Sequence, residues 1–387
     1  MRKIRFWSII NEQHSGMRSI DQELKIFRKE TGIIVELTEF PWRTVWDNII
    51  NSIKEENKPD VLQIGNSWTS ILSQIGYLED ITQLFQYKDH INDIYNISPE
   101  IDKRYYSMPW LLDLSLLFIR KNSDTKGCRL DTVNDLLSLC RSQKESKLFS
   151  FGGNKDPILI QYLSSFIWSA GGDYIQGNGI DLATAENYTG IRNFFNLAQK
   201  YSLKHELLNI YGDVIWDFFL KGKGLFTFAN AWVINSFIKP YRNENKFMAV
   251  VLPGTGKARY PFKGGSCLGI VKGTPVLKES IEFIRFLTGP DSQKRYLTRI
   301  GALPVRKDVL HKVIDEFLYR DAILHTLRTA RTFPARPYWG SCEKILLEFI
   351  NDIFIDIVDN RYSEKNLRKK VKELNPFIRT VIDLWGR

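Results

Sequence analysis

Three side chains that can bind a polar molecule stand together where an apolar run ends. In "PDVLQIGNSW" the run 61–64 stops at a glycine, and Asn66, Ser67 and Trp68 follow at once. The amide and the hydroxyl can exchange hydrogen bonds with a ligand, and the indole offers a large flat apolar face. The structural alternative is that Ser67 caps a helix and Trp68 packs in a core. Because they follow a strand, we expect these residues to face a ligand.

Two carboxylates also stand where they could serve a site. Asp113 lies between Leu112 and Leu114, close to Trp110, in an otherwise apolar run. Burial of an aspartate without partners is costly, so Asp113 either meets a ligand or caps backbone amides at a hinge. Glu12 follows the first apolar run and could accept hydrogen bonds from hydroxyl groups, or it could be a solvated loop residue.

Alternating strand and helix patterns must hold these groups in place. Strand-like runs cover 4–10, 33–37 and 61–64, with apolar residues at helical spacing between them. The first of these helices is expected to stop at Thr31-Gly32. The alternation predicts a parallel sheet covered by helices. Ligands bind beyond the carboxyl ends of such strands, so a first strand next to the third would bring the polar residues after both into one crevice.

The remaining chain continues this α/β pattern. A helix is expected near 184–201, and "GLFTFANAW" reads as a strand over 225–228 that reaches a cleft floor. The region 313–387 is expected to be helical except around "FPARPYWG". There is no internal repeat, so the pattern describes one mixed α/β protein.

Composition narrows the function classes. The 387 residues, 43% hydrophobic, are enough for two cores, and ten tryptophans exceed the need of one core. The net charge of +10 could serve an acidic partner, but the basic residues are spread along the chain, which favours a solvated surface and no nucleic acid. The four cysteines match no zinc or redox spacing, and the phosphate-binding and G-x-S-x-G motifs are absent. No cofactor or metal is therefore expected.

The start of the chain fits a first β-strand. Its apolar run, 4–10, is too short for a secretory signal and lacks a small-residue cleavage site. Two locations stay open: outside the cytoplasm after removal of a signal, or cytoplasmic.

Five segments, in order, resemble the family 1 extracellular solute-binding proteins of ABC importers, the maltose-binding-protein-like sugar-binding group. They are "TGIIVELTEFPWRTVWDNI", "PDVLQIGNSWTSILSQIGYLEDIT", "YSMPWLLDLSLLFIRKN", "FLKGKGLFTFANAW" and "FIRFLTGPDSQKRYLTRIGALPVRKDVL". The resemblance implies two α/β lobes, each a mainly parallel sheet flanked by helices, with a ligand cleft between them. The first lobe would hold 1–112 and 263–312, and the second 113–262 and 313–387.

The resemblance also implies a set of ligand-binding residues. Asp113 stands where the family often places a sugar-contacting aspartate, and Trp232 matches its stacking tryptophan. A sugar offers flat C–H faces to aromatic rings and hydroxyls to amides and carboxylates. The expected ligand-binding residues are Glu12, Asn66, Ser67, Trp68, Trp110, Asp113, Trp168, Asn230, Trp232, Gly265, Arg336, Tyr338 and Trp339. Asn230 replaces the family's usual glycine, and Gly264 and Gly265 could instead serve only the crossing between lobes.

The leading hypothesis is a monomeric carbohydrate receptor, without catalytic residues, that delivers its ligand to the transmembrane subunits of an ABC permease. One alternative is a glycosidase that uses Glu12 and Asp113 as a carboxylate pair. Another is a ligand sensor built on the same fold, inside the cell or linked to signalling. The sequence does not name the ligand.

Overall fold

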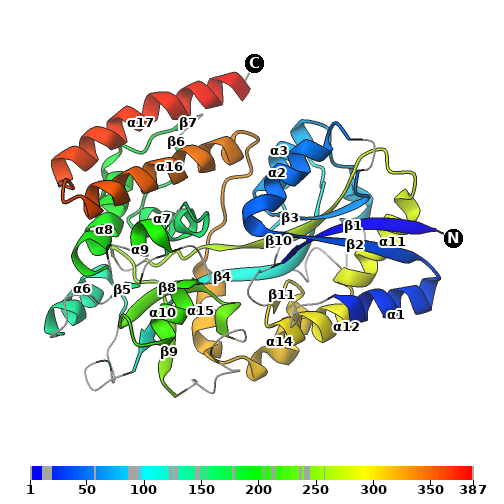
Figure 1. Ribbon diagram of the computed structural model, residues 1–387, viewed down its shortest axis with the longest axis horizontal. Coiled ribbons are helices and arrows are strands. Elements are labelled where there is room, and N and C mark those ends of the chain that lie inside the picture. The colour runs from blue at the N-terminus through cyan, green and yellow to red at the C-terminus, as the bar shows by residue number, and fades with distance from the viewer. Residues whose placement is uncertain are drawn as a thin grey trace.

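The computed structural model shows one curved sheet that passes through two lobes, with helices on both faces (Figure 1). The structure describes residues 2–10, 20–55, 58–85, 95, 97–121, 125, 130–143, 149–150, 152–153, 155–176, 179–202, 204, 206–210, 214–234, 238, 245–256 and 258–385. The strand order is β2-β1-β3-β10-β4-β8-β5, and β9 and β11 also pair with β4. We call the half built on β1, β2, β3 and β10 the first lobe, and the half built on β5, β8 and β9 the second lobe.

The strands are β1 (Lys3–Ile10), β2 (Ile34–Pro41), β3 (Val61–Gly65), β4 (Met108–Arg120), β5 (Phe149–Ser150), β6 (Ile175–Gln176), β7 (Gly179–Ile180), β8 (Phe226–Asn230), β9 (Phe247–Val251), β10 (Lys263–Ile270) and β11 (Leu303–Pro304). The helices are α1 (Asp21–Thr31), α2 (Trp42–Ser52), α3 (Trp68–Gln74), α4 (Thr82–Phe85), α6 (Val133–Ser142), α7 (Ile158–Ser169), α8 (Ala185–Tyr201), α9 (Glu206–Asn209), α10 (Val214–Leu220), α11 (Leu277–Thr288), α12 (Pro290–Ser292), η3 (Gln293–Leu297), α13 (Thr298–Ile300), α14 (Lys307–Val313), η4 (Ile314–Glu316), α15 (Arg320–Thr329), α16 (Trp339–Val358) and α17 (Glu364–Trp385).

In the first lobe the first and third strands are neighbours, which is the condition for their polar residues to share one crevice. β1 lies between β2 and β3 and pairs in parallel with both. Ile4, Phe6 and Ser8 alternate into the interior of β1, as a half-buried strand requires. Helix α1 ends at the predicted place, since Gly32 adopts φ 75° and its N–H donates to the carbonyl of Arg28. β1 and β3 therefore end at the same edge of the sheet.

Strand β4 carries the chain from one lobe to the other. Its first half pairs antiparallel with β10 and β11, and its second half pairs antiparallel with β8 and β9. Leu116, Leu117 and Phe118 are fully buried, so the near-continuous apolar run is explained by cover on both faces. Asp113 and Ser115 interrupt this run in the middle of the strand, at the crossing.

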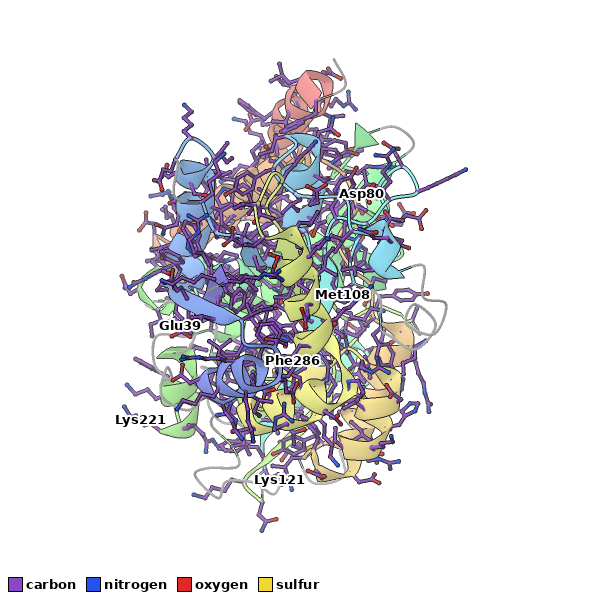
Figure 2. The ribbon with its side chains drawn as sticks, turned by 90° about the vertical axis from the view of Figure 1, so that its right-hand side faces the viewer. Glu39, Asp80, Met108, Lys121, Lys221 and Phe286 are labelled. Carbon is purple, nitrogen blue, oxygen red and sulfur yellow. The ribbon has the colours of Figure 1, made fainter. Side chains whose placement is uncertain are left out.

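Helices cover each lobe on two sides (Figure 1). In the first lobe α2 and α3 pack on one face, and α1 and α11 pack together on the other. In the second lobe α7, α8, α16 and α17 stack on the face that continues α2 and α3, and α15 lies on the opposite face. Basic side chains such as Lys121 and Lys221 project at separate points of the periphery (Figure 2), in agreement with a charge spread over the surface.

Candidate functional site

The end of β3 places its polar residues at the boundary between the lobes. Asn66 is buried, and its Nδ2 donates to Thr332 Oγ1 at 3.1 Å and to the carbonyl of Ile97 at 3.4 Å. Ser67 stands at the N-cap position of α3 but forms no capping hydrogen bond; its Oγ donates to Glu343 Oε2 of α16 at 3.3 Å. Two consecutive first-lobe residues therefore contact the C-terminal part of the chain.

Trp68 belongs to a cluster of three tryptophans that the sequence analysis did not identify. Its ring lies 5.1 Å from the ring of Trp46 and 5.6 Å from that of Trp42, centroid to centroid. A Cβ at Gly65 would stand 3.4 Å from the Trp68 ring, so the indole lies over the end of β3. Trp42 is 42% exposed, which leaves an aromatic face open at this edge of the first lobe.

Asp113 and Asn230, both expected to bind the ligand, contact each other. Asn230 Nδ2 donates to Asp113 Oδ2 at 2.7 Å and to Gln161 Oε1 of α7 at 2.8 Å, and Asn230 Oδ1 accepts from Ser115 Oγ at 2.9 Å. Asp113 Oδ1 also accepts a hydrogen bond from the backbone N–H of Leu114 at 3.0 Å. Asp113 therefore caps a backbone amide, and this does not prevent it from binding a ligand as well. Asp113 and Gln161 are half-buried, whereas Asn230 is buried. The carboxylate and the Gln161 amide are thus held in place while they keep access to solvent.

Gly264 joins these two groups into one site. It pairs with Asp113 across β10 and β4, and opposite residues of an antiparallel pair point to the same face. A Cβ at Gly264 would stand 3.1 Å from Asn66 Oδ1 and 2.3 Å from the Phe262 ring. Asn66, after β3, and Asp113, in the middle of β4, therefore both lie beside Gly264, over which the Phe262 ring packs.

Gly265 serves the backbone crossing. Its φ is 138°, and a Cβ would stand 2.0 Å from the carbonyl oxygen of Leu111, which no side chain could tolerate. Its own carbonyl accepts the N–H of Asn66 at 3.2 Å. The described contacts assign Gly265 to the strand crossing beside the site.

Trp232 lies just beyond β8, which continues to Asn230, two residues further than the strand predicted over 225–228. The N–H of Ala231 extends the pairing by donating to the carbonyl of Leu114 at 2.9 Å. The Trp232 ring is partly buried and packs against a core cluster, so part of the ring stays accessible.

Three of the expected tryptophans are core residues. Trp110 is 1% exposed and stacks on Tyr296 of η3, with centroids 5.6 Å apart. Trp168 and Trp339 are buried in the second-lobe core, where each packs against Phe333. A ring without an accessible face cannot stack on a ligand in this conformation, so the candidate site is drawn without these three.

Two further expected residues lie on the segment before α16. Arg336 is exposed, and Tyr338 is partly buried against the second-lobe core, where burial raises the pKa of its phenol. Glu12 lies outside the described residues. The remaining candidate site consists of Asn66, Ser67, Trp68, Asp113, Asn230 and Trp232, joined by Trp42, Trp46, Gln161 and Glu343.

Glu343 has a pKa that its surroundings shift strongly from the ordinary value. It lies in the second turn of α16, is half-buried, and faces α3 through Ser67. Burial raises the pKa of Glu343 to about 7, although the hydroxyl of Ser67 and the indole of Trp339 favour the ionised form. Perturbed carboxyls of this kind gather at functional sites. No specific sequence signal marked Glu343, since α16 carries several carboxylates and a solvated helix shows the same pattern.

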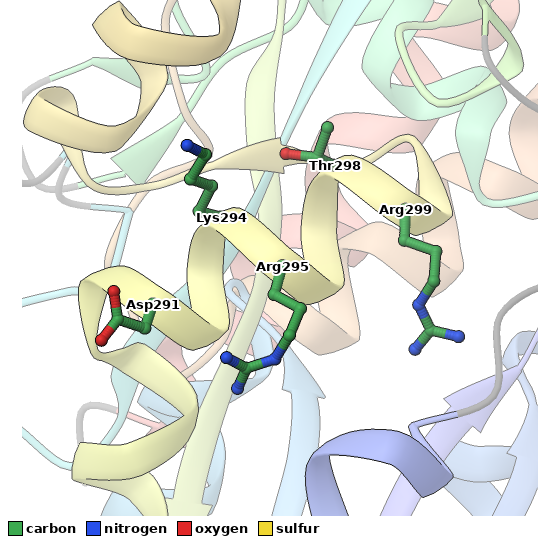
Figure 3. A pocket seen from close by; sticks show the side chains of 5 residues that line it. All are labelled: Asp291, Lys294, Arg295, Thr298 and Arg299. Carbon is green, nitrogen blue, oxygen red and sulfur yellow. The ribbon is translucent and has the colours of Figure 1, made fainter. Parts of the chain in front are cut away.

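Two surface hollows lie away from this set. One, of about 520 Å³, is on the outside of the first lobe, where Arg295 and Arg299 project toward α1 and Lys294 points away (Figure 3). Arg295 pairs there with the buried carboxylate of Glu23 at 2.6 Å. The other, of about 460 Å³, lies beside α14 and α15 and is lined by residues that include His311 and Arg320. Neither hollow contains a residue of the candidate site.

Within the described ranges, no three His, Cys, Asp or Glu side chains gather as a metal ion would require. None of the described helices has the length and the apolar run needed to cross a bilayer.

Two lobes joined by crossing strands, with aromatic, amide and carboxylate groups gathered between them, define a two-lobed solute-binding protein. The chain belongs to the bacterial extracellular solute-binding protein family, whose model matches residues 23–322. The resemblance seen in the sequence is thereby confirmed.

Individual proteins show the same relationship. The chain is 22% identical over 340 residues to the diacetylchitobiose binding protein DasA of Streptomyces coelicolor, a match that covers 82% of this chain and 77% of DasA. A solute-binding protein of an ABC transporter from Thermotoga lettingae, bound with α-D-tagatose, superposes with a TM-score of 0.85 at 16% identity, covering 99% of this chain and 100% of that one. Maltose-bound MalE3 of T. maritima superposes with a TM-score of 0.78 at 21% identity, covering 97% and 99%. These superpositions establish the shared fold.

Proposed function

We propose that the protein is the substrate-binding component of an ABC importer and binds a mono- or oligosaccharide between its lobes. The observation that carries the proposal is the placement of Asn66 and Asp113 around Gly264, with Trp68 at the first-lobe edge and Trp232 after β8. The relatives named above are described as binding diacetylchitobiose, tagatose and maltose.

The side-chain chemistry suits a neutral polyhydroxylated ligand. Asp113 is a hydrogen-bond acceptor that Asn230 holds in place, and a charged acceptor binds a hydroxyl roughly twice as strongly as a neutral one does. The Gln161 amide, fixed by the same Asn230, can both donate and accept. Trp42, Trp68 and Trp232 supply accessible or partly accessible rings for the C–H faces of a sugar.

The partners and the location follow from the same role. We assign 1–112 with 263–312 to the first lobe and 113–262 with 313–387 to the second, so that β4 and β10 form the hinge. The closed clamp would work as a monomer outside the cytoplasm and pass its sugar to the transmembrane subunits of a permease. Small-angle scattering with a bound sugar should show a smaller radius of gyration than without it.

We propose binding without catalysis. A glycosidase needs a second carboxylate about 5 Å from the first, or about 6.5–9.5 Å away for inversion. The partners of Asp113 include an amide and a backbone N–H, which suit a fixed acceptor. Incubation with chromogenic glycosides should release no chromophore; turnover that Asp113→Asn abolishes would overturn this part of the proposal.

A thermal-shift screen over mono- and oligosaccharides tests the binding function. A ligand at about 100 times its Kd adds about 2.7 kcal/mol to the free energy of unfolding, which raises the Tm by several degrees. Amino acids, peptides and glycerophosphodiesters form the comparison set. A shift in that set and none among the sugars would refute carbohydrate binding while leaving the two-lobed clamp in place.

A further inference from the structure

One contact links the lobes on the side of α3 and α16. Ser67, at the start of α3, donates to Glu343 Oε2 at 3.3 Å across 276 residues of sequence. The two helices approach closely there, since a Cβ at Gly340 would stand 3.9 Å from Ile71 Cγ2. We call the Ser67–Glu343 pair the closure contact. Because Glu343 is half-buried against the opposite lobe, its carboxyl group loses water when the lobes meet.

Among the described residues, few other groups around Glu343 can titrate in the same range. Helix α3 has no ionisable side chain, and Tyr162 is the only one on α7. Burial raises the pKa of the neighbouring Cys342 thiol to about 12 and raises that of the Tyr174 phenol and of Tyr162 as well, so these stay neutral near pH 7. The carboxylate of Asp173, beside Tyr174, is paired with Arg331. Among these described groups, Glu343 is therefore the one whose ionisation we expect to change near pH 7, and we assign a pH response of the closure contact to it.

We propose that Glu343 couples proton uptake to lobe closure, so that the lobes close with its carboxyl group protonated and open when it ionises. The proposal rests on the function above, because closure is the motion by which a clamp retains its ligand. It adds a regulation of that site: acidic surroundings favour the closed form, and neutral to alkaline surroundings favour opening and release.

The size of the effect follows from linkage. The pKa of Glu343 is about 7 in the closed contact, against the ordinary value of 4.5 that an exposed carboxyl regains when the lobes separate. A group whose pKa is raised by closure favours the closed form fully below the open-form value and loses that contribution as the pH rises through about 7. Between about pH 7.5 and about pH 5.5 the ratio of closed to open molecules should rise about 20-fold.

The experiment measures closure without any ligand. Spin labels on cysteines introduced at Lys54 and Lys365, both exposed, report the distance between the first lobe and α17 in a Cys128→Ser background. The other three native cysteines are buried, so the spin-label reagent should react only with the two introduced cysteines. The closed-to-open ratio of the wild type should rise about 20-fold on acidification over that interval.

Variants separate Glu343 from the rest of the helix. Glu343→Gln keeps the shape and removes the titration, so its closed population should be independent of pH. Asp352→Asn, an exposed carboxylate on the same helix, should titrate like the wild type. Ser67→Ala should lower the closed population at every pH and keep its pH dependence, because burial is the main cause of the raised pKa.

Two results would overturn the proposal: a wild-type closed-to-open ratio that changes less than about 2-fold over the interval, or a Glu343→Gln protein that keeps the wild-type pH dependence. If Glu343→Gln does not fold, the wild-type titration alone decides, since a midpoint far from pH 7 contradicts the assignment. No sugar enters the measurement, so its failure leaves carbohydrate binding untouched, and an unsuccessful sugar screen leaves the closure result standing.

Discussion

Asn230 is the residue on which the geometry of the candidate site most depends, and Asn230→Ala tests that dependence. Its amide makes three hydrogen bonds, to Asp113, Gln161 and Ser115, and the side chain is 2% exposed. Neutral hydrogen bonds contribute about 1 kcal/mol each and one to a carboxylate about 1.5–3 kcal/mol, so the sum is about 3.5–5 kcal/mol. In the variant, water can replace Asn230 as the hydrogen-bond partner of Asp113 and Gln161, which are half-buried. Water cannot replace it at Ser115, which is fully buried. We therefore expect Asn230→Ala to lower the free energy of unfolding by about 3 kcal/mol.

Urea unfolding, followed by tryptophan fluorescence, measures this loss. Ser115→Ala is the matched control, because it removes one of the same three hydrogen bonds and should cost about 1 kcal/mol. The double variant should cost less than the sum of the two single variants by about 1 kcal/mol, since one hydrogen bond is shared. A loss below about 1 kcal/mol for Asn230→Ala, with additive effects in the double variant, would refute the network as the support of Asp113.

Three further substitutions test the assignment of site and core. Asp113→Asn should weaken sugar binding by about 1 kcal/mol, roughly 5-fold by calorimetric titration, with little change in Tm; a sharp drop in Tm at unchanged affinity would make Asp113 a backbone cap alone. Trp232→Ala should reduce affinity roughly 30-fold to several hundred-fold, by about 2–4 kcal/mol, and cost less stability than a core tryptophan does; near-normal affinity would remove this ring from the site. Trp110→Ala should cost about 3–5 kcal/mol of unfolding free energy, because the ring fills the first-lobe core against Tyr296; a stable variant with lost affinity would return Trp110 to the cleft.

Much of the fold could be read from local sequence. Apolar residues at every second position predict β1, and the apolar run before Gly65 predicts β3. Both patterns lie within a few consecutive residues, so no distant residue is needed to recognise them. The end of the first helix was predictable from Gly32 alone, because glycine can adopt a positive φ. Asn66, Ser67 and Asp113 were identifiable for a similar reason, since polar groups at strand ends or inside apolar runs need a partner.

What the sequence could not decide is which aromatic rings are accessible. Trp68, Trp110 and Trp339 all stand beside polar residues or near strand ends and helix starts, yet only Trp68 keeps an exposed part. The difference arises from what packs against each ring: Tyr296 covers Trp110, and Phe333 covers Trp339. Those partners come from distant segments, so no local pattern distinguishes the three.

Local sequence was enough to predict β1, β3, the end of α1 and the polar residues at the crossing, because each depends on chain neighbours within a few positions. That Glu343 faces Ser67, and that Asn66 and Asp113 both lie beside Gly264, follows from long-range packing. A carboxylate on a helix has the same local sequence whether it faces water or another lobe. The pKa of Glu343 is raised by burial in the folded chain, where its carboxylate faces a residue 276 positions away.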